Sequence, residues 1–314
     1  MSLKTSYLGF NLPHPFIPGA SPLSDDLDSV RKLEDVGAPM IVMSSLFEEQ
    51  LTRSSVHGRS APQGKPDQKA SEAYLEHMVK LKHGVEIPII ASLNCTSRGN
   101  WLSFALQLEQ AGVDALELNM YQVPADSMRA GSVIESENLQ MVRALKTRVK
   151  LPLAVKLSPY YSSLSHFAHG LFEAGADALV LFNRFLQADL DVEKMEMTRF
   201  HHLSTSGDVL LRLHWITILR RSMGSVQLAG NGGVHTAQDA VKLLVAGADV
   251  LQVVSVLLNG GPEALNELRE QTERWLDKHG FGSLAELRES RPDNLGAMAT
   301  QRTEYIETLR EWQR

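Results

Sequence analysis

The sequence predicts an α/β protein built as one barrel of parallel strands, with residues 1–314 forming a single domain. Two observations lead to this: eight short apolar runs of strand length, and helical patterns in the connections between them. Continuous apolar strands joined by helices indicate a parallel sheet that is covered on its outer face. Eight such units in 314 residues favour a (β/α)8, or TIM, barrel. A doubly wound open sheet is the alternative, and the even eightfold spacing argues against it.

A recurring phrase marks four of the strands. In each copy a glycine ends a helix and an apolar strand follows at once. The copies are Val36-Gly37-Ala38-Pro39, Ala111-Gly112-Val113-Asp114, Ala174-Gly175-Ala176-Asp177 and Ala246-Gly247-Ala248-Asp249. The other four strand candidates lie between them, at residues 15–20, 88–94, 151–158 and 226–230.

The connections contain helices and long loops. Apolar periodicity predicts helices over residues 27–36, 101–111, 136–149, 237–246 and 262–279. Residues 50–70 are polar and lack such a period, residues 120–131 form an irregular loop, and residues 185–208 are a further long connection. Long loops at the carboxyl ends of barrel strands are typical of lids and substrate loops.

The stretch from Gln227 to Leu258 is predicted to form a strand, a glycine turn, a helix and a second strand, in that order. Thr236 and Asp239 have the spacing of a capping box at the start of the helix. The glycines of Gly230-Asn231-Gly232-Gly233 would let the main chain approach a ligand, and the nearby helix N-terminus favours an anion. A phosphate cradle is the favoured interpretation, and a turn that uses glycine for geometry alone is the alternative.

Composition excludes several classes of partner. The chain is 43% hydrophobic and 22% charged with a net charge of −6, so we expect no binding to nucleic acid or to an anionic membrane. Cys95 is the only cysteine, which rules out an internal disulfide and a multi-cysteine metal site, and we expect no metal. The first residues lack the apolar core of a signal peptide, so we expect a cytoplasmic protein.

In such a barrel the chemistry lies where strands end. Lys156 is the most informative residue there, because its alternation with Ala154 points it to the barrel interior. A bound anion or an electron-rich ring would compensate its buried charge. A salt bridge to Glu117 is the alternative, and the two roles are compatible. The other polar and small residues at strand ends are Ser21, Ser44, Asn94, Cys95, Asn119, Ser158, Asn183, Gly232, Gly233 and Ser255.

These motifs resemble the dihydroorotate dehydrogenase family of FMN-dependent barrels over almost the whole chain. Its strongest matches are residues 155–159, 229–234 and 238–249, and Ser206-Gly207 and the Asn-ended fourth and sixth strands give further support. The resemblance implies an oxidoreductase that acts on CH–CH groups, with FMN as cofactor and a small-molecule substrate, in a family associated with pyrimidine biosynthesis. A homodimer is also expected. By the same resemblance Lys156 stabilises negative charge on the reduced flavin. The implied contacts of the FMN phosphate end are Gly207, Gly230, Gly232, Gly233, Val254 and Ser255. The implied contacts of the ring or substrate are Ala20, Ser21, Ser44, Asn119 and Asn183.

The residues that act on the substrate in this family differ in this chain. The position of the family's cysteine or serine base is Gln122, which cannot accept a proton, and the substrate lysine after the second strand corresponds to Met43. The Asn-x-Met-Gly segment before Tyr74 is missing. The usual Gly-Thr of the last strand reads Val254-Ser255. We therefore expect a substrate other than dihydroorotate.

Four residues remain candidates for proton transfer. Tyr121 and Ser127 lie in the loop after the fourth strand, Cys95 ends the third strand, and His57 lies in the long polar loop. Tyr121 is chemically suited to donate a proton during reduction of an activated double bond. The alternatives are a tyrosine that covers the site, a cysteine that serves packing and a solvated histidine. We take Lys156, Tyr121 and Ser127 as the catalytic candidates.

Three functions are consistent with these residues. The favoured one is hydride transfer between a small substrate and flavin. A second is a barrel lyase or isomerase that holds a substrate phosphate in the glycine turn and forms a Schiff base at Lys156. A third is a flavin-binding relative without catalysis.

Overall fold

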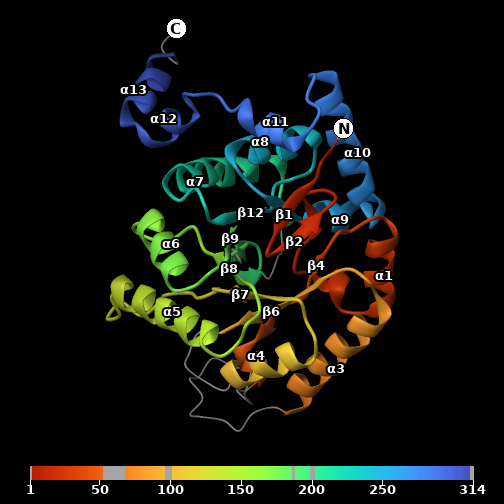
Figure 1. The fold of residues 1–314 in the computed structure, drawn as a ribbon. Helices are drawn as coiled ribbons and strands as arrows, with labels where there is room; N and C mark the ends of the chain where they lie inside the picture. Colours follow the sequence, from red (N-terminus) through yellow and green to blue (C-terminus); the bar gives the residue numbers. More distant parts are fainter. Residues whose placement is uncertain (1, 52–67, 96–100, 186–187, 199–201, 312–314) are drawn as a thin grey trace.

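The computed structural model describes residues 2–51, 68–95, 101–185, 188–198 and 202–311. Within these residues the central sheet consists of parallel strands in the order β3-β13-β12-β9-β8-β7-β6-β4, and β3 and β4 at its two ends contact each other. A short further strand, β5, continues along β6. The helices surround this sheet (Figure 1). The predicted (β/α)8 barrel is confirmed.

The elements have the following bounds. The barrel strands are β3 (Phe16–Pro18), β4 (Ile41–Val42), β5 (Leu46–Phe47), β6 (Ile89–Asn94), β7 (Ala115–Asn119), β8 (Leu153–Leu157), β9 (Ala178–Leu181), β12 (Gln227–Asn231) and β13 (Val250–Val253). Two hairpins lie outside the barrel sheet, β1 (Thr5–Tyr7) with β2 (Phe10–Leu12) and β10 (Asp189–Asp191) with β11 (Glu196–Thr198). The helices are α1 (Leu27–Asp35), α2 (Glu48–Leu51), α3 (Gln68–Gly84), α4 (Trp101–Gln110), α5 (Gly131–Lys146), α6 (Leu164–Glu173), α7 (Val209–Ser222), α8 (Ala237–Ala246), α9 (Ser255–Gly260), α10 (Glu263–Lys278), α11 (Leu284–Glu289), α12 (Leu295–Thr300) and α13 (Arg302–Glu311). Short 3-10 turns occupy Pro22–Ser24 and Ser206–Asp208.

Alternation along the strands sorts the core into two layers. Ala154 and Ala178 belong to a compact inner cluster of small and β-branched residues, whereas Val155 and Leu179 belong to the larger cluster between barrel and helices. Successive side chains of a strand point to opposite faces, so one strand serves both layers. The inner layer fills the barrel and leaves room for a ligand only beyond the strand ends.

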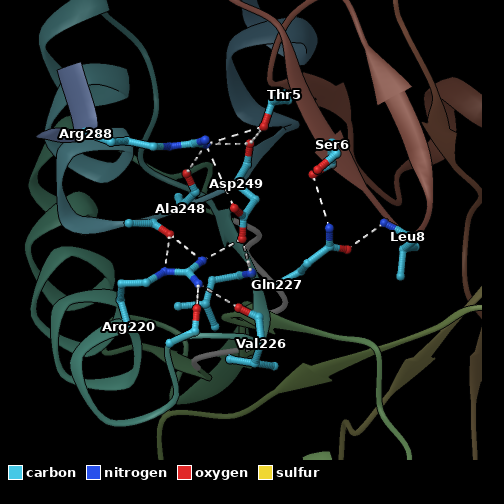
Figure 2. Close-up of polar contacts among 12 residues, drawn as sticks. Thr5, Ser6, Leu8, Arg220, Val226, Gln227, Ala248, Asp249 and Arg288 are labelled. Carbon is cyan, nitrogen blue, oxygen red and sulfur yellow. Dashed lines mark hydrogen bonds and ion pairs between the residues drawn. The ribbon is translucent and has the colours of Figure 1, made fainter. Parts of the chain in front are cut away.

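The hairpin of β1 and β2 was not expected from the sequence, and it closes the amino-terminal end of the barrel. Its turn at Leu8 and Gly9 has positive φ angles of 50° and 86°. Tyr7 and Leu8 pack into the inner cluster beside the first residues of several strands. The side chain of Gln227 accepts a hydrogen bond from the Leu8 amide at 2.7 Å and donates one to the Ser6 carbonyl (Figure 2).

Three charged residues lie at the same end of the barrel, and we call them the base arginine group: Arg220, Asp249 and Arg288. Arg220 contacts Asp249 Oδ2 at 2.6 Å and donates to the carbonyls of Gly247, Gly224 and Val226 (Figure 2). Arg288 lies 3.9 Å from Asp249 Oδ1 and donates to the Ala248 and Asp249 carbonyls. The group ties α7 and α11 to the start of β13.

Several local predictions are confirmed with small shifts. Thr236 and Asp239 form the expected capping box of α8, and Gly247 ends that helix with a φ of 122°. The helix predicted at 262–279 is α10, followed by Gly280 with a φ of 79°.

One prediction needs correction, and one connection contains elements that were not predicted. The helix expected to begin at Ser136 begins at Gly131, because residues before the apolar stripe, including the exposed Val133, continue the helix in solvent. The long connection over residues 185–208, for which no strand was predicted, contains the hairpin of β10 and β11. Asp191 Oδ1 accepts hydrogen bonds from the amides of Glu193 and Lys194, which stabilises its turn.

One predicted loop is described only at its ends. Gln50 lies in α2 and Ala70 lies in α3. His57 and residues 52–67 lie outside the described residues. Among the helices that the structure describes, none has the length and apolar character needed to cross a membrane.

Candidate active site at the barrel mouth

A cavity of about 510 Å³ opens where the barrel strands end. Ten of the residues selected from the sequence line it: Ala20, Ser21, Ser44, Asn119, Tyr121, Lys156, Asn183, Gly232, Val254 and Ser255. They come from strand ends that are far apart in the sequence and meet because parallel strands of a barrel all end on the same side. The size is within the range of pockets that bind cofactors.

Lys156 lies in the wall of this cavity and is 5% exposed. Its Nζ is 3.4 Å from Oε1 of the fully buried Glu117, so the expected salt bridge is present. The other oxygen of Glu117 accepts a hydrogen bond from Gln252 Nε2 at 2.6 Å. Glu117 Oε1 makes no hydrogen bond within the described residues, since the approach of Lys156 is an ion pair without hydrogen-bond alignment. The ammonium group therefore keeps donors for a ligand.

Asn119 presents an unsatisfied acceptor. Its Nδ2 donates to Ser45 Oγ at 3.1 Å, and Ser45 in turn contacts Ser92 Oγ at 2.8 Å. Asn119 Oδ1 is buried and has no hydrogen-bond partner among the described residues. A buried carbonyl oxygen without a donor costs stability, so this atom is suited to accept a hydrogen bond from a ligand.

Ser44 lines the cavity, but its hydroxyl is already hydrogen-bonded within the protein. Its Oγ donates toward the Ser21 carbonyl at 2.7 Å and Asp25 Oδ1 at 2.5 Å. Tyr74, which the sequence did not select, donates to the carbonyls of Ser44 and Ser92. Burial raises the pKa of Tyr74. These bonds fix the ends of β4 and β6 beside the cavity.

The four glycines predicted to hold a phosphate differ in position. Gly232, with a φ of 88°, lines the cavity. A Cβ on Gly230 would lie 2.9 Å from Leu243 Cδ1, so this residue faces the helix layer. A Cβ on Gly233 would lie 2.7 Å from the Val209 amide nitrogen, and its own amide donates to Ser204 Oγ. Gly207 is exposed in the 3-10 turn. The structure places only Gly232 of the four against the cavity.

The proton-transfer candidates are separated by the structure. Tyr121 lines the cavity and stacks on Phe185 with ring centroids 4.6 Å apart. Both rings also line a smaller neighbouring cavity of about 270 Å³, where Gln122 and Cys95 lie. Ser127 is exposed and lines neither cavity. Burial raises the pKa of Cys95, which keeps it a thiol. The geometry favours Tyr121 over the other described candidates.

The sequence did not select Arg184, Ser204 and Arg212, which also line the cavity. Arg212 lies in the apolar first turn of α7, shortly after Ser206-Gly207, and an arginine on a buried helix stripe is a signal that could have identified it. Arg184 directly follows Asn183 at a strand end. Among the described residues that line the cavity, the charged ones are Lys156, Arg184 and Arg212, all of them cations.

Comparisons with known proteins agree with this geometry. The family model described as dihydroorotate dehydrogenase matches residues 65–276. The chain is 26% identical over 298 residues to a dihydroorotate dehydrogenase B (NAD(+)) catalytic subunit of Methanothermobacter thermautotrophicus, which covers 91% of this chain and 97% of the relative. It is 25% identical over 304 residues to a dihydroorotate dehydrogenase A (fumarate) of Lactobacillus delbrueckii subsp. bulgaricus, with 89% and 95% covered. A catalytic subunit of the B type from Pyrococcus abyssi is 26% identical over 298 residues, with 91% and 97% covered.

The matched region extends from before α3 into α10 and so includes Asn119, Lys156, Asn183, Gly232 and Ser255. The chain therefore belongs to the dihydroorotate dehydrogenase family of FMN-dependent oxidoreductases, which act on CH–CH groups.

Proposed function

We propose that the cavity at the barrel mouth is the FMN and substrate site, and that the protein transfers hydride between a small CH–CH substrate and the flavin. Gly232, Val254 and Ser255 would lie at the phosphate end. The residues proposed along the ring and substrate are Ala20, Ser21, Ser44, Asn119, Lys156 and Asn183. Gly207, Gly230 and Gly233 would support the glycine turn from outside the cavity.

The charge of the cavity wall carries this proposal. All charged residues among its described lining are cations. Glu117 pairs with Lys156. Among the described residues Asp208 alone faces both Arg184 and Arg212, so an anionic cofactor would balance the charge that remains. The buried Asn119 Oδ1 offers an acceptor to a ring N–H. The donors and acceptors present thus fit a flat molecule with one anionic end.

Bound FMN would supply the acceptor for hydride. Lys156 would hold a positive charge beside the ring, where Glu117 keeps the ammonium in place. Tyr121 would donate the proton to the substrate during reduction of an activated double bond, because Tyr121 borders the cavity and Gln122 cannot take that role.

The substrate is proposed to differ from dihydroorotate. The relatives are named for dihydroorotate as substrate and, in their two types, for NAD(+) or fumarate. In this chain Met43 is buried in the outer core, and Gln122 lines the neighbouring cavity instead of the main one. The substrate cation and the base of the family are therefore both missing at those positions.

The absorbance spectrum of the purified protein tests the first part of the proposal. We expect a yellow protein whose flavin is released on denaturation as FMN, with at most slow bleaching by dihydroorotate. Loss of a positioned base alone costs roughly 10²–10⁴-fold in rate. A protein that stays colourless after addition of FMN would contradict the site, and rapid dihydroorotate turnover would contradict the substrate proposal. A flavin that no CH–CH substrate bleaches would favour the non-catalytic alternative.

We also propose that residues 1–314 act as one domain in a cytoplasmic homodimer. A single core that includes the N-terminal Leu3 and Leu287 of α11 supports the one-domain assignment. One cooperative unfolding transition, and a mass from light scattering twice that of the 34.8 kDa chain, are the expected results. Fractionation of cells would test the compartment.

A further inference from the structure

Three charged residues lie where the glycine turn meets α7, and we call them the mouth arginine group: Arg184, Asp208 and Arg212. Arg212 Nη1 is 4.0 Å from Asp208 Oδ1, and Arg184 Nη1 is 3.9 Å from Asp208 Oδ2. Arg184 and Arg212 both line the main cavity, whereas Asp208 does not. One carboxylate at these distances cannot balance two guanidinium groups, so a positive charge remains on the cavity side.

Arg212 is the more buried of the two, with 8% of its side chain exposed. Its Nε donates to the Asn231 carbonyl at 2.9 Å and its Nη1 donates to the Asp208 carbonyl at 2.9 Å. No hydrogen bond of Nη2 is found within the described residues, and this nitrogen lies 3.3 Å from the position that a Cβ on Gly232 would take. A guanidinium group has five N–H donors, so Arg212 retains unsatisfied donors in a buried place.

Burial is also unfavourable for the charge of Arg212. Desolvation lowers its pKa, Asp208 raises it and Arg184 lowers it again. The guanidinium group nevertheless stays protonated in proteins, so the charge must be balanced by a partner. Two fixed backbone bonds orient the group toward Gly232, and that orientation suits a phosphate, which guanidinium groups bind through paired hydrogen bonds.

One backbone donor of the glycine turn is already used within the protein. The Gly233 amide already donates to Ser204 Oγ at 3.1 Å, and Ser204 Oγ also contacts Ser255 Oγ at 2.9 Å. These bonds satisfy part of the turn from within the protein.

We propose that Arg212, assisted by Arg184, is the residue by which this chain distinguishes a flavin that carries a phosphate from one that does not. This inference rests on the proposed function, because it places the phosphate of FMN at Gly232. It assigns phosphate recognition to a side-chain charge in addition to the amides of the glycine turn.

The test compares FMN with riboflavin, which has the same ring and no phosphate. Flavin is removed from the purified protein, and both ligands are titrated against it by quenching of flavin fluorescence. We expect Arg212→Met to weaken FMN binding about 10- to 100-fold, since a hydrogen bond to a charged group contributes on that scale. Riboflavin binding should change by less than about twofold, because the ring contacts lie on other strands.

Three further variants test whether the effect depends on the charge of Arg212 and on its place at the cavity. Arg212→Lys keeps the charge and should retain more of the preference for FMN than Arg212→Met. Arg184→Met changes a residue that is one-third exposed and should cost FMN binding roughly two- to fivefold without affecting riboflavin. This variant also provides the test if Arg212→Met does not fold. Arg221→Met removes an exposed charge from the same helix and is the matched control, with no expected effect on either ligand.

The outcomes separate this inference from the proposed function. FMN binding of wild-type strength in Arg212→Met, or an equal loss for both flavins, overturns the role of Arg212 and leaves the FMN site in place. If Arg212→Met cannot be obtained folded, FMN binding of wild-type strength in Arg184→Met overturns it. A wild-type protein that binds neither flavin overturns both proposals.

Discussion

The two ends of the barrel each carry two arginines with one aspartate between them, and the two groups differ in how well they are satisfied. At the base, Arg220 contacts Asp249 at 2.6 Å, and its other N–H groups donate hydrogen bonds to backbone carbonyls (Figure 2). At the mouth, Arg212 is 4.0 Å from Asp208 and faces a cavity. Arg212 and Arg220 belong to the same helix, α7.

The difference indicates what each group does. A buried cation whose donors are all used stabilises the fold, because removing it leaves an unpaired carboxylate and unpaired carbonyls. A buried cation with spare donors costs stability until a ligand balances it. The fold thus keeps the fully hydrogen-bonded Arg220 at the closed end, and it keeps Arg212 with its spare donors, together with the unsatisfied Asn119 Oδ1, at the open end.

The largest expected effect concerns Tyr121 at the mouth. Tyr121→Phe should slow the reoxidation of the reduced enzyme by fumarate or another activated alkene by about 10²–10⁴-fold, because the proton donor is lost. Ser127→Ala, which alters an exposed residue of the same loop, is the control and should leave the rate unchanged. Stopped-flow absorbance of the flavin measures both. An effect of Ser127 larger than that of Tyr121 would reverse the assignment.

Arg220→Met tests the base arginine group. Removing one partner of a fully buried ion pair costs about 3–5 kcal/mol. Arg220 and Asp249 are partly buried, with 16% and 20% of their side chains exposed, so we expect a smaller loss, about 2–3 kcal/mol, in the free energy of unfolding. Arg212→Met should cost clearly less in the absence of flavin, since it also relieves an unbalanced charge. Urea denaturation of the two flavin-free variants gives the comparison. Equal losses would show that both groups are structural.

His14, which precedes β3, adds a pH dependence to the base of the barrel. Its Nε2 is 2.8 Å from the Gly37 carbonyl, and burial lowers its pKa from 6.5 to about 4, with a further lowering by Arg269. The unfolded chain therefore binds a proton at a higher pH than the folded chain. The stabilising contribution is present above pH 6.5 and is lost as the pH falls toward 4.

The size of this loss is of order 3 kcal/mol, from about 1.4 kcal/mol per pKa unit. His14→Gln, which cannot titrate, should lack this part of the pH dependence of unfolding. Urea midpoints at intervals between pH 7 and pH 4 provide the measurement. Parallel curves for the variant and the wild type would contradict the assignment.

The smallest expected effect is a shift in flavin reduction potential. Lys156→Met should lower the potential by about 30–60 mV, since the negative charge on the reduced ring loses its partner and Glu117 is left uncompensated. Glu117→Gln should shift it in the opposite direction. Redox titration with indicator dyes measures both variants. Shifts of the same sign would contradict an electrostatic role, and an adduct trapped on Lys156 by borohydride would favour the Schiff-base alternative.

Local patterns in the sequence were sufficient for the barrel and for most strand ends. Helix ends such as Gly247 and Gly280, and the capping box of Thr236 and Asp239, depend on neighbours in the chain and were found where expected. The inward direction of Lys156 followed from alternation along β8, because the side-chain period of a strand is a local property. Ten of the site residues expected from these local signals and from the family resemblance line one cavity.

Only the tertiary structure decided which of these residues face the cavity and which polar groups remain unsatisfied. Gly230 and Gly232 belong to one motif, yet one faces the helix layer and the other faces the cavity. Arg212 and Arg220 lie on one helix. Asp208 precedes Arg212 by only four residues, whereas the contacts of Arg220 with Asp249 and of Arg184 with Asp208 join distant parts of the chain. Sequence alone determined the residue types and their period, whereas the balance of charge depends on distances between segments that only folding brings together.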